Sequence, residues 1–183
     1  METATLKRLV GNYHAIEMKI AIQGLGEIPT TVELVIERET PDISYVICSD
    51  YQLKYVAKRA GYGKPNEQVI KAAVRKGKTK VVFQKCDVFD PASVWEAIAK
   101  ILKELDPKKD EVIVNYTGGS AVVRLLLGTL GVMLLTMMKG RILYAIRYPK
   151  GVELTTNHTE ELKDIFRKLK VSFGAMDAGK RSK

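Results

Sequence analysis

The chain has 183 residues, enough for one globular domain with at most a short appendage. Hydrophobic residues make up 46% and charged residues 28%, a balance that excludes sustained disorder. The 30 Lys and Arg against 21 Asp and Glu give a formal net charge of +9. This charge favours an anionic partner such as a nucleotide or nucleic acid, although a solvated basic surface explains it equally well.

No segment has the pattern of a membrane span or a secretion signal. The longest apolar stretch, 125–138, is shorter than the roughly 20 residues that cross a bilayer, and the N-terminus lacks the apolar run of a signal peptide. Cys48 and Cys86 lie in apolar, strand-like runs, so we expect buried, reduced thiols rather than a disulfide framework or a metal site. These features predict a cytoplasmic protein that does not associate with membranes.

Strand and helix patterns alternate along the chain. Apolar, β-branched runs predict the strands, and apolar residues at helical spacing predict the helices. The predicted strands are 18–23, 42–50, 79–86, 110–116 and 141–148, and a turn at 149–151 leads to a short partner strand, 152–156. The predicted helical segments are 30–38, 51–60, 66–78, 91–105, 121–138 and 157–170.

This alternation predicts an α/β fold: a Rossmann-like, mostly parallel sheet with helices on both faces and a C-terminal β-hairpin. Right-handed crossovers place each helix over the sheet. We expect the domain to span 18–170, between an N-terminal extension, 1–17, and a basic tail, 171–183. The helix 121–138 is apolar on most sides, so we expect it to be buried on most sides and to lie at a subunit interface.

Two glycine-containing loops each follow a strand and lead into a helix. In an open parallel sheet, ligands bind outside the C-terminal ends of the strands, which is where both loops belong. Glycine lets backbone N–H groups approach phosphate oxygens, and a helix N-terminus adds partial positive charge. The two loops are 23–31, QGLGEIPTT, and 117–120, TGGS.

The first loop partly matches the GxGxxG fingerprint of dinucleotide-binding sites. Gly24 and Gly26 have the right spacing, and Asp50 ends the second strand. However, Pro29 stands where the third glycine belongs, and Glu27 would bring negative charge toward a pyrophosphate. A dinucleotide-dependent oxidoreductase is therefore a distant alternative. A turn that requires glycine between strand and helix explains this loop equally well.

Taken together, these features resemble the CRISPR-associated Rossmann fold (CARF) domains, which bind cyclic oligoadenylates. The resemblance spans residues 18 to about 169. It rests on LGEIP after the first strand, NYTGGS after the fourth, the long apolar helix behind it, and the hairpin RILYAIRY-PKG-VELTT. It implies a homodimer in which one ligand bridges both chains across a two-fold axis. We expect no cofactor and no bound metal.

The resemblance also implies which residues contact the ligand. Arg124 lies one helical turn beyond Ser120 and could reach a phosphate, although an arginine on a helix surface is equally ordinary. Members of the family often have a basic residue where this chain has Ala121, and a serine where it has Ile28. The candidate contacts are Gln23, Gly24, Leu25, Gly26, Thr31, Asn115, Thr117, Gly118, Gly119 and Arg124.

The resemblance further implies an activity. After 159 there is room for one helix and a tail, as in stand-alone ring nucleases that cut cyclic tetra-adenylate and switch off type III CRISPR signalling. Each cut would be a metal-independent attack of a ribose 2′-OH on the adjacent phosphate, leaving a 2′,3′-cyclic phosphate. Lys150 would stabilise the developing charge, although a solvated turn lysine is as ordinary. The hydroxyl that orients the ribose or phosphate would come from Thr30, Thr31, Thr117 or Ser120.

Two alternatives keep the family but change the activity. The absence of the family's serine at Ile28 allows a non-cleaving sensor of the same ligand. A CARF transcription regulator would suit the positive charge, but no recognition helix is visible, so we do not expect DNA binding.

Overall fold

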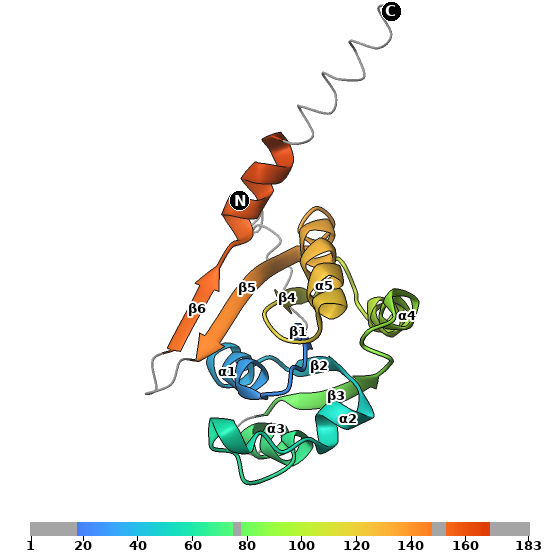
Figure 1. Cartoon of the computed structure of the whole chain (residues 1–183). Helices are drawn as coiled ribbons and strands as arrows, with labels where there is room; N and C mark the ends of the chain where they lie inside the picture. The colour runs from blue at the N-terminus through green and yellow to red at the C-terminus, as the bar shows by residue number, and fades with distance from the viewer. Residues whose placement is uncertain (1–17, 75–77, 148–152, 169–183) are drawn as a thin grey trace, which may run out of the picture.

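The computed structural model describes residues 18–74, 78–147 and 153–168 (Figure 1). They contain a six-stranded sheet of order β3-β2-β1-β4-β5-β6, in which β1 to β5 are parallel and β6 is antiparallel to β5. This confirms the predicted Rossmann-like fold and its C-terminal hairpin. The strands are β1 Lys19–Gly24, β2 Ile43–Cys48, β3 Lys80–Lys85, β4 Glu111–Asn115, β5 Lys139–Arg147 and β6 Glu153–Asn157.

Helices cover both faces of the sheet, as Figure 1 shows. Their ends differ from the predicted ones by a few residues, and in the described region 50–74 two short helices flank a 3₁₀ turn. Residues 159–168 are also helical. The other helices are α1 Thr30–Glu39, α2 Asp50–Lys54, η2 Lys58–Ala60, α3 Asn66–Val74, α4 Pro91–Leu102 and α5 Ala121–Leu134.

The core lies in two layers because successive strand residues point to opposite faces of the sheet. In β4, Val112 and Val114 pack with residues of α4 and α5, whereas Ile113 packs with Leu34 and Val35 of α1. Every residue of β4 is buried, which agrees with its place inside the sheet. The parallel pairing of β1 with β4 places their C-terminal ends side by side.

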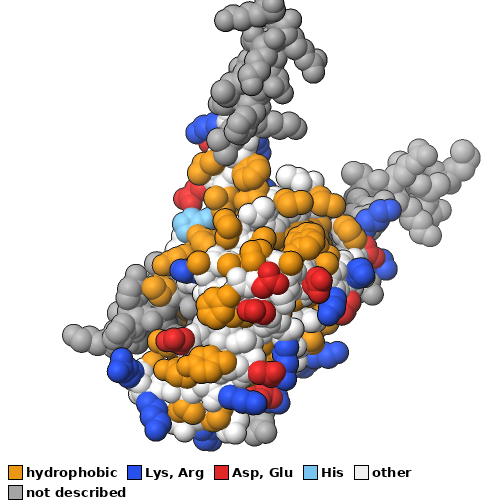
Figure 2. All heavy atoms as spheres, turned by 45° about the vertical axis from the view of Figure 1, so that its right-hand side comes forward, with side chains coloured by type: hydrophobic (Ala, Val, Ile, Leu, Met, Phe, Trp, Pro, Cys, Tyr) orange, Lys and Arg blue, Asp and Glu red, His pale blue; other side chains and the backbone are white. Residues whose placement is uncertain are grey.

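The single chain leaves part of the helix after the second glycine loop exposed, so its predicted burial on most sides, at a subunit interface, stays a prediction. Val123, Leu127 and Leu130 of α5 are buried, but Leu125 is 70% exposed and Met133 is 52% exposed. The sheet covers one face of α5 only. Figure 2 shows hydrophobic side chains gathered on this side of the molecule, over α5 and the helix 159–168.

Both cysteines are free. Burial raises the pKa of Cys48 to about 12, so its thiol is neutral at physiological pH. Cys86 is only partly buried. Among the described residues, no helix combines the length and apolar character that crossing a bilayer requires.

Candidate functional site

The two glycine loops are in direct contact. Strands β1 and β4 are neighbours, so the segments that follow them meet at one edge of the sheet. A Cβ placed on Gly118 would lie 2.2 Å from the carbonyl oxygen of Gly24, and a Cβ on Gly24 would lie 2.6 Å from that of Gly118. Gly119 has a φ of +97°, which disfavours any other residue. The contact between the loops therefore explains these glycines by itself, whether or not a ligand binds there.

Gly26 is different. A Cβ there would lie 3.7 Å from the backbone nitrogen of Gly119, which is an ordinary van der Waals distance. Its neighbour Leu25 is fully buried, and the Leu25 carbonyl accepts a hydrogen bond of 2.6 Å from Nε2 of Gln52. Only the backbone of Leu25 can therefore face a ligand, while Gly26 stands at the outer edge of the loop contact.

A chain of hydrogen bonds runs beneath both loops. Gln23 donates from Nε2 to Ser44 Oγ over 2.8 Å and accepts at Oε1 from Asn115 Nδ2 over 3.2 Å. Asn115 Oδ1 in turn accepts from the Thr117 N–H, and the Thr117 hydroxyl accepts from the Ala145 N–H over 2.8 Å. Gln23 and Asn115 are fully buried. Their side chains thus support the loops from within the sheet and do not reach the surface.

The second loop presents backbone donors at the start of α5. Ser120 caps this helix: its hydroxyl accepts from the Val123 N–H over 3.2 Å and donates to the Val88 carbonyl. The N–H groups of Gly118, Gly119 and Ala121 donate to no other residue in the described part of the chain. Successive unpaired N–H groups at a helix N-terminus are suited to bind an anion.

The first loop ends at a helix without a side-chain cap. Pro29 occupies the N-cap of α1 and offers no side-chain acceptor. The Thr30 hydroxyl lies 3.1 Å from the Tyr62 hydroxyl, which ties it to the segment before α3. The Thr31 hydroxyl is buried without a partner in the structure, and it lies 2.9 Å from the position of a Cβ on Gly118. Thr31 thus points an unsatisfied hydroxyl at the junction of the loops.

Beside the second loop is a cavity of about 370 Å³, which the sequence analysis did not identify. Arg124 is exposed there, and its side chain makes no hydrogen bond or ion pair with any described residue. A neighbouring cavity of about 390 Å³ separates α5 from the helix 159–168 and shares Tyr116, Arg124 and Leu125 with the first. The first cavity is lined by Tyr116, Thr117, Ala121, Arg124, Leu125 and Tyr144.

Tyr116 and Tyr144 belong to an aromatic cluster at this edge. Their ring centroids are 6.0 Å apart, and the ring of His158 lies 6.5 Å from Tyr116 and 6.3 Å from Tyr144. Burial raises the pKa of Tyr116, and Tyr144 adds to this effect, so the phenol stays neutral at physiological pH. The available signal in the sequence was Tyr116 directly before TGG; nothing local links Tyr144 to it.

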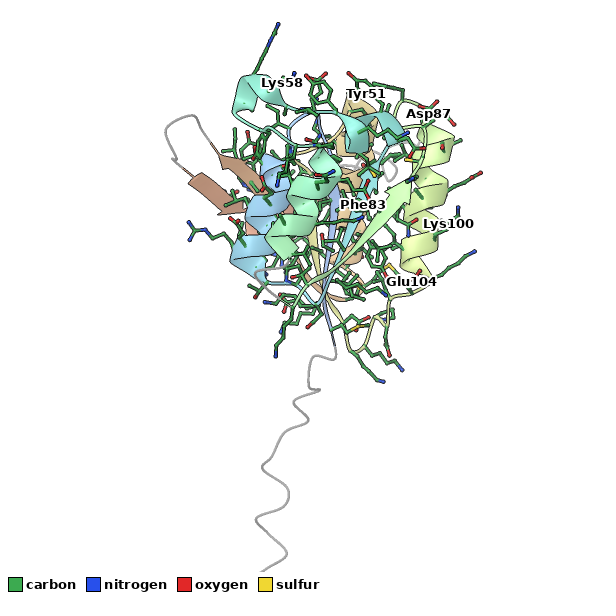
Figure 3. All side chains as sticks on the ribbon, turned by 90° about the horizontal axis from the view of Figure 1, so that it is seen from below. Tyr51, Lys58, Phe83, Asp87, Lys100 and Glu104 are labelled. Atoms are coloured by element: carbon green, nitrogen blue, oxygen red, sulfur yellow. The ribbon has the colours of Figure 1, made fainter. Side chains whose placement is uncertain are left out.

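One candidate residue cannot be placed relative to the loops. Lys150 falls outside the described residues, so its position relative to the loops stays a prediction. Figure 3 shows Tyr51, Lys58 and Asp87 along the edge toward which β3 points, whereas Glu104 lies toward the opposite end. Within the described ranges, no group of at least three His, Cys, Asp or Glu is arranged to hold a metal ion.

No protein-family model matches the sequence, and no curated protein matches it. Its fold is similar to that of Can2 from Sulfobacillus thermosulfidooxidans in complex with cyclic tetra-adenylate, with a TM-score of 0.53 and 14% identity over 74% of this chain and 36% of Can2. It is also similar to Enterococcus italicus Csm6 bound to cyclic hexa-2′-fluoro-hexa-dAMP, with a TM-score of 0.54 and 14% identity over 75% of this chain and 36% of Csm6. At this identity, the similarity supports the Rossmann-like fold alone.

Proposed function

We propose that this chain is a CARF domain that binds a cyclic oligoadenylate, with cyclic tetra-adenylate as the expected ring. The observation that carries the proposal is the contact between the two glycine loops at the N-terminus of α5, beside a run of unpaired backbone donors. The cyclic oligonucleotides bound to Can2 and Csm6 support this class of ligand.

In this proposal, a phosphate of the ring accepts hydrogen bonds from the N–H groups of Gly118, Gly119 and Ala121. The positive end of the α5 dipole favours the negative charge. Arg124, one turn further along α5 and without an ion pair in the described chain, adds a cation. Gln23 and Asn115 hold the loops in position through their buried hydrogen bonds.

We also propose that the ligand is shared by two chains. The exposed apolar residues of α5 and the helix 159–168 form a surface that a second copy would cover, and Leu125 of this surface lines both cavities beside the second loop. A two-fold dimer through this surface would present each glycine loop twice, which suits a cyclic ligand with two-fold symmetry. The surface comprises Leu125, Met133, Ile165 and Phe166.

The proposed reaction is cleavage of the ring. A ribose 2′-hydroxyl gives up its proton to solvent as its oxygen attacks the adjacent phosphorus, the bond from phosphorus to the 5′-oxygen breaks, and the 5′-oxygen takes up a proton, leaving a 2′,3′-cyclic phosphate. Lys150 stabilises the charge on the phosphorane. Among the candidate hydroxyls, those of Thr30, Thr117 and Ser120 already have partners, whereas the Thr31 hydroxyl has none in the structure. We propose that one of these four hydroxyls orients the ligand.

The test is to incubate the protein with radiolabelled cyclic tetra-adenylate in EDTA and to separate the products. A linear product that ends in a 2′,3′-cyclic phosphate is expected. Tight binding without a linear product would rule out the cleavage and leave a sensor, and the absence of binding would refute the family assignment. Lys150→Ala should slow cleavage far more than it weakens binding; an equal loss of both would reject its catalytic role.

A further inference from the structure

We infer that the cavity between Tyr116, Tyr144 and Arg124 is a purine-base subsite. The inference rests on the proposed function, because it concerns the base attached to a phosphate that is bound at the second glycine loop. Thr117 and Ala121 line the same cavity, and the unpaired N–H groups of Gly118 and Gly119 lie between them in the chain. A phosphate held by these groups would therefore lie beside the cavity.

The strand register explains why the two tyrosines meet. Tyr116 continues the face of β4 that carries Val112 and Val114, and both valines pack in the same layer as α5. Tyr144 shares its face of β5 with Ile142, which lies 3.0 Å from the position of a Cβ on Gly131 of α5. Both rings thus lie on the α5 side of the sheet. They are tilted by 51°, so neither ring covers the other by stacking.

The lining of the cavity fits a nucleobase better than an acidic or aliphatic group. It contains both tyrosines and an arginine without a partner in the described chain, and it includes no Asp or Glu. Aromatic rings stack on bases, and a guanidinium can either stack on a base or donate to the N7 acceptor of a purine. The hydroxyl of Thr117 accepts from Ala145, so this residue fixes the wall of the cavity.

The rings of Tyr116 and Tyr144 are also held in place by contacts within the chain, so the cavity is preorganised. His158 packs against both tyrosines, and its Nδ1 lies 2.6 Å from the carboxylate of Glu161. The backbone N–H of His158 donates to the Ile142 carbonyl over 3.0 Å, which holds the start of the helix 159–168 against β5. Rings held in this way lose little conformational freedom when a base stacks on them.

The experiment uses cyclic tetra-adenylate in which one adenine is replaced by 2-aminopurine, whose fluorescence falls on stacking. The wild-type protein should quench the probe. Tyr116→Leu and Tyr144→Leu should each weaken binding by about tenfold or more and reduce the quenching, while Tyr116→Phe and Tyr144→Phe should stay within about twofold of wild type. Tyr51→Leu, which changes a 65% exposed tyrosine on α2, is the matched control and should bind normally.

A second measurement does not depend on whether the variants fold. Cyclic tetra-uridylate should bind the wild-type protein at least about tenfold more weakly than cyclic tetra-adenylate, because a pyrimidine offers less stacking surface and no N7. Equal affinities for the two rings, or leucine variants that bind and quench like wild type, would overturn the subsite while leaving the proposed function intact. If the wild-type protein binds neither ring, the proposed function itself fails.

Discussion

Gly118 and Gly24 approach each other so closely that neither position can accept a side chain without movement of the backbone. A glycine pair after a strand is commonly attributed to a phosphate, but here the neighbour that requires it is the other loop. The two explanations are compatible, because the N–H groups at the start of α5 have no partners in the described chain. The glycines therefore shape the donor site rather than simply making space for a ligand.

Gly118→Ala should destabilise the protein by about 1–3 kcal/mol, because its Cβ would overlap the carbonyl of Gly24, and it should weaken ligand binding. Urea denaturation followed by circular dichroism measures the free energy of unfolding. Gly26→Ala is the matched control in the same loops and should change this free energy by less than about 0.5 kcal/mol. Equal effects of the two substitutions would contradict the loop contact described here.

At the scale of single residues, the sequence predicted some features of the candidate site and not others. It identified both glycine loops, since glycine between a strand and a helix is a local signal. It could not distinguish Gly26, which has room for a Cβ, from Gly24, which does not, because that difference depends on a contact between segments far apart in the chain. The pairing of Tyr116 with Tyr144 was missed for the same reason.

At the scale of elements, α5 joins the proposed site to the core through its first turn. Ser120 accepts a hydrogen bond from the Val123 N–H and donates to the Val88 carbonyl, which links the second loop to the segment that precedes α4. The same helix packs Val123 against both loops. A change at the cap should therefore affect both stability and the position of the loop.

Ser120→Ala should lower the free energy of unfolding by about 1–2 kcal/mol, because the helix loses its cap and the Val88 carbonyl loses a donor. The check is a urea titration against wild type. Thr129→Ala, which removes an exposed hydroxyl that donates to the Leu125 carbonyl within the same helix, should change the free energy by less than about 0.5 kcal/mol. If Ser120→Ala is as stable as wild type, the cap does not contribute as described.

Most strands and helices followed from local patterns, since apolar periodicity determines which residues a sheet can bury. The environment of α5 did not follow from its local pattern. Its sequence is apolar on most sides, yet Leu125 and Met133 are exposed because only one face of the helix meets the sheet. Whether an apolar surface is buried within the chain or against a second chain depends on tertiary and quaternary contacts that the sequence of one helix does not encode.

At the scale of the whole molecule, these exposed residues predict a dimer. Leu125→Lys places a charge in the proposed interface and should convert a dimer into a monomer without unfolding it, because Leu125 is 70% exposed in the single chain. Size-exclusion chromatography with light scattering measures the mass. Tyr51→Lys, at another exposed position, should remain a dimer. A wild-type protein that is monomeric at micromolar concentration would refute this interface.

The central claim is that a cyclic oligoadenylate binds between two chains at the glycine loops. Isothermal titration calorimetry with cyclic tetra-adenylate tests it most directly, because the same titration reports affinity and stoichiometry. We expect saturable binding of one ring per two chains in the wild-type protein and strongly weakened binding in Gly118→Ala. A wild-type titration without binding heat at several temperatures, or one that saturates at one ring per chain, would contradict it.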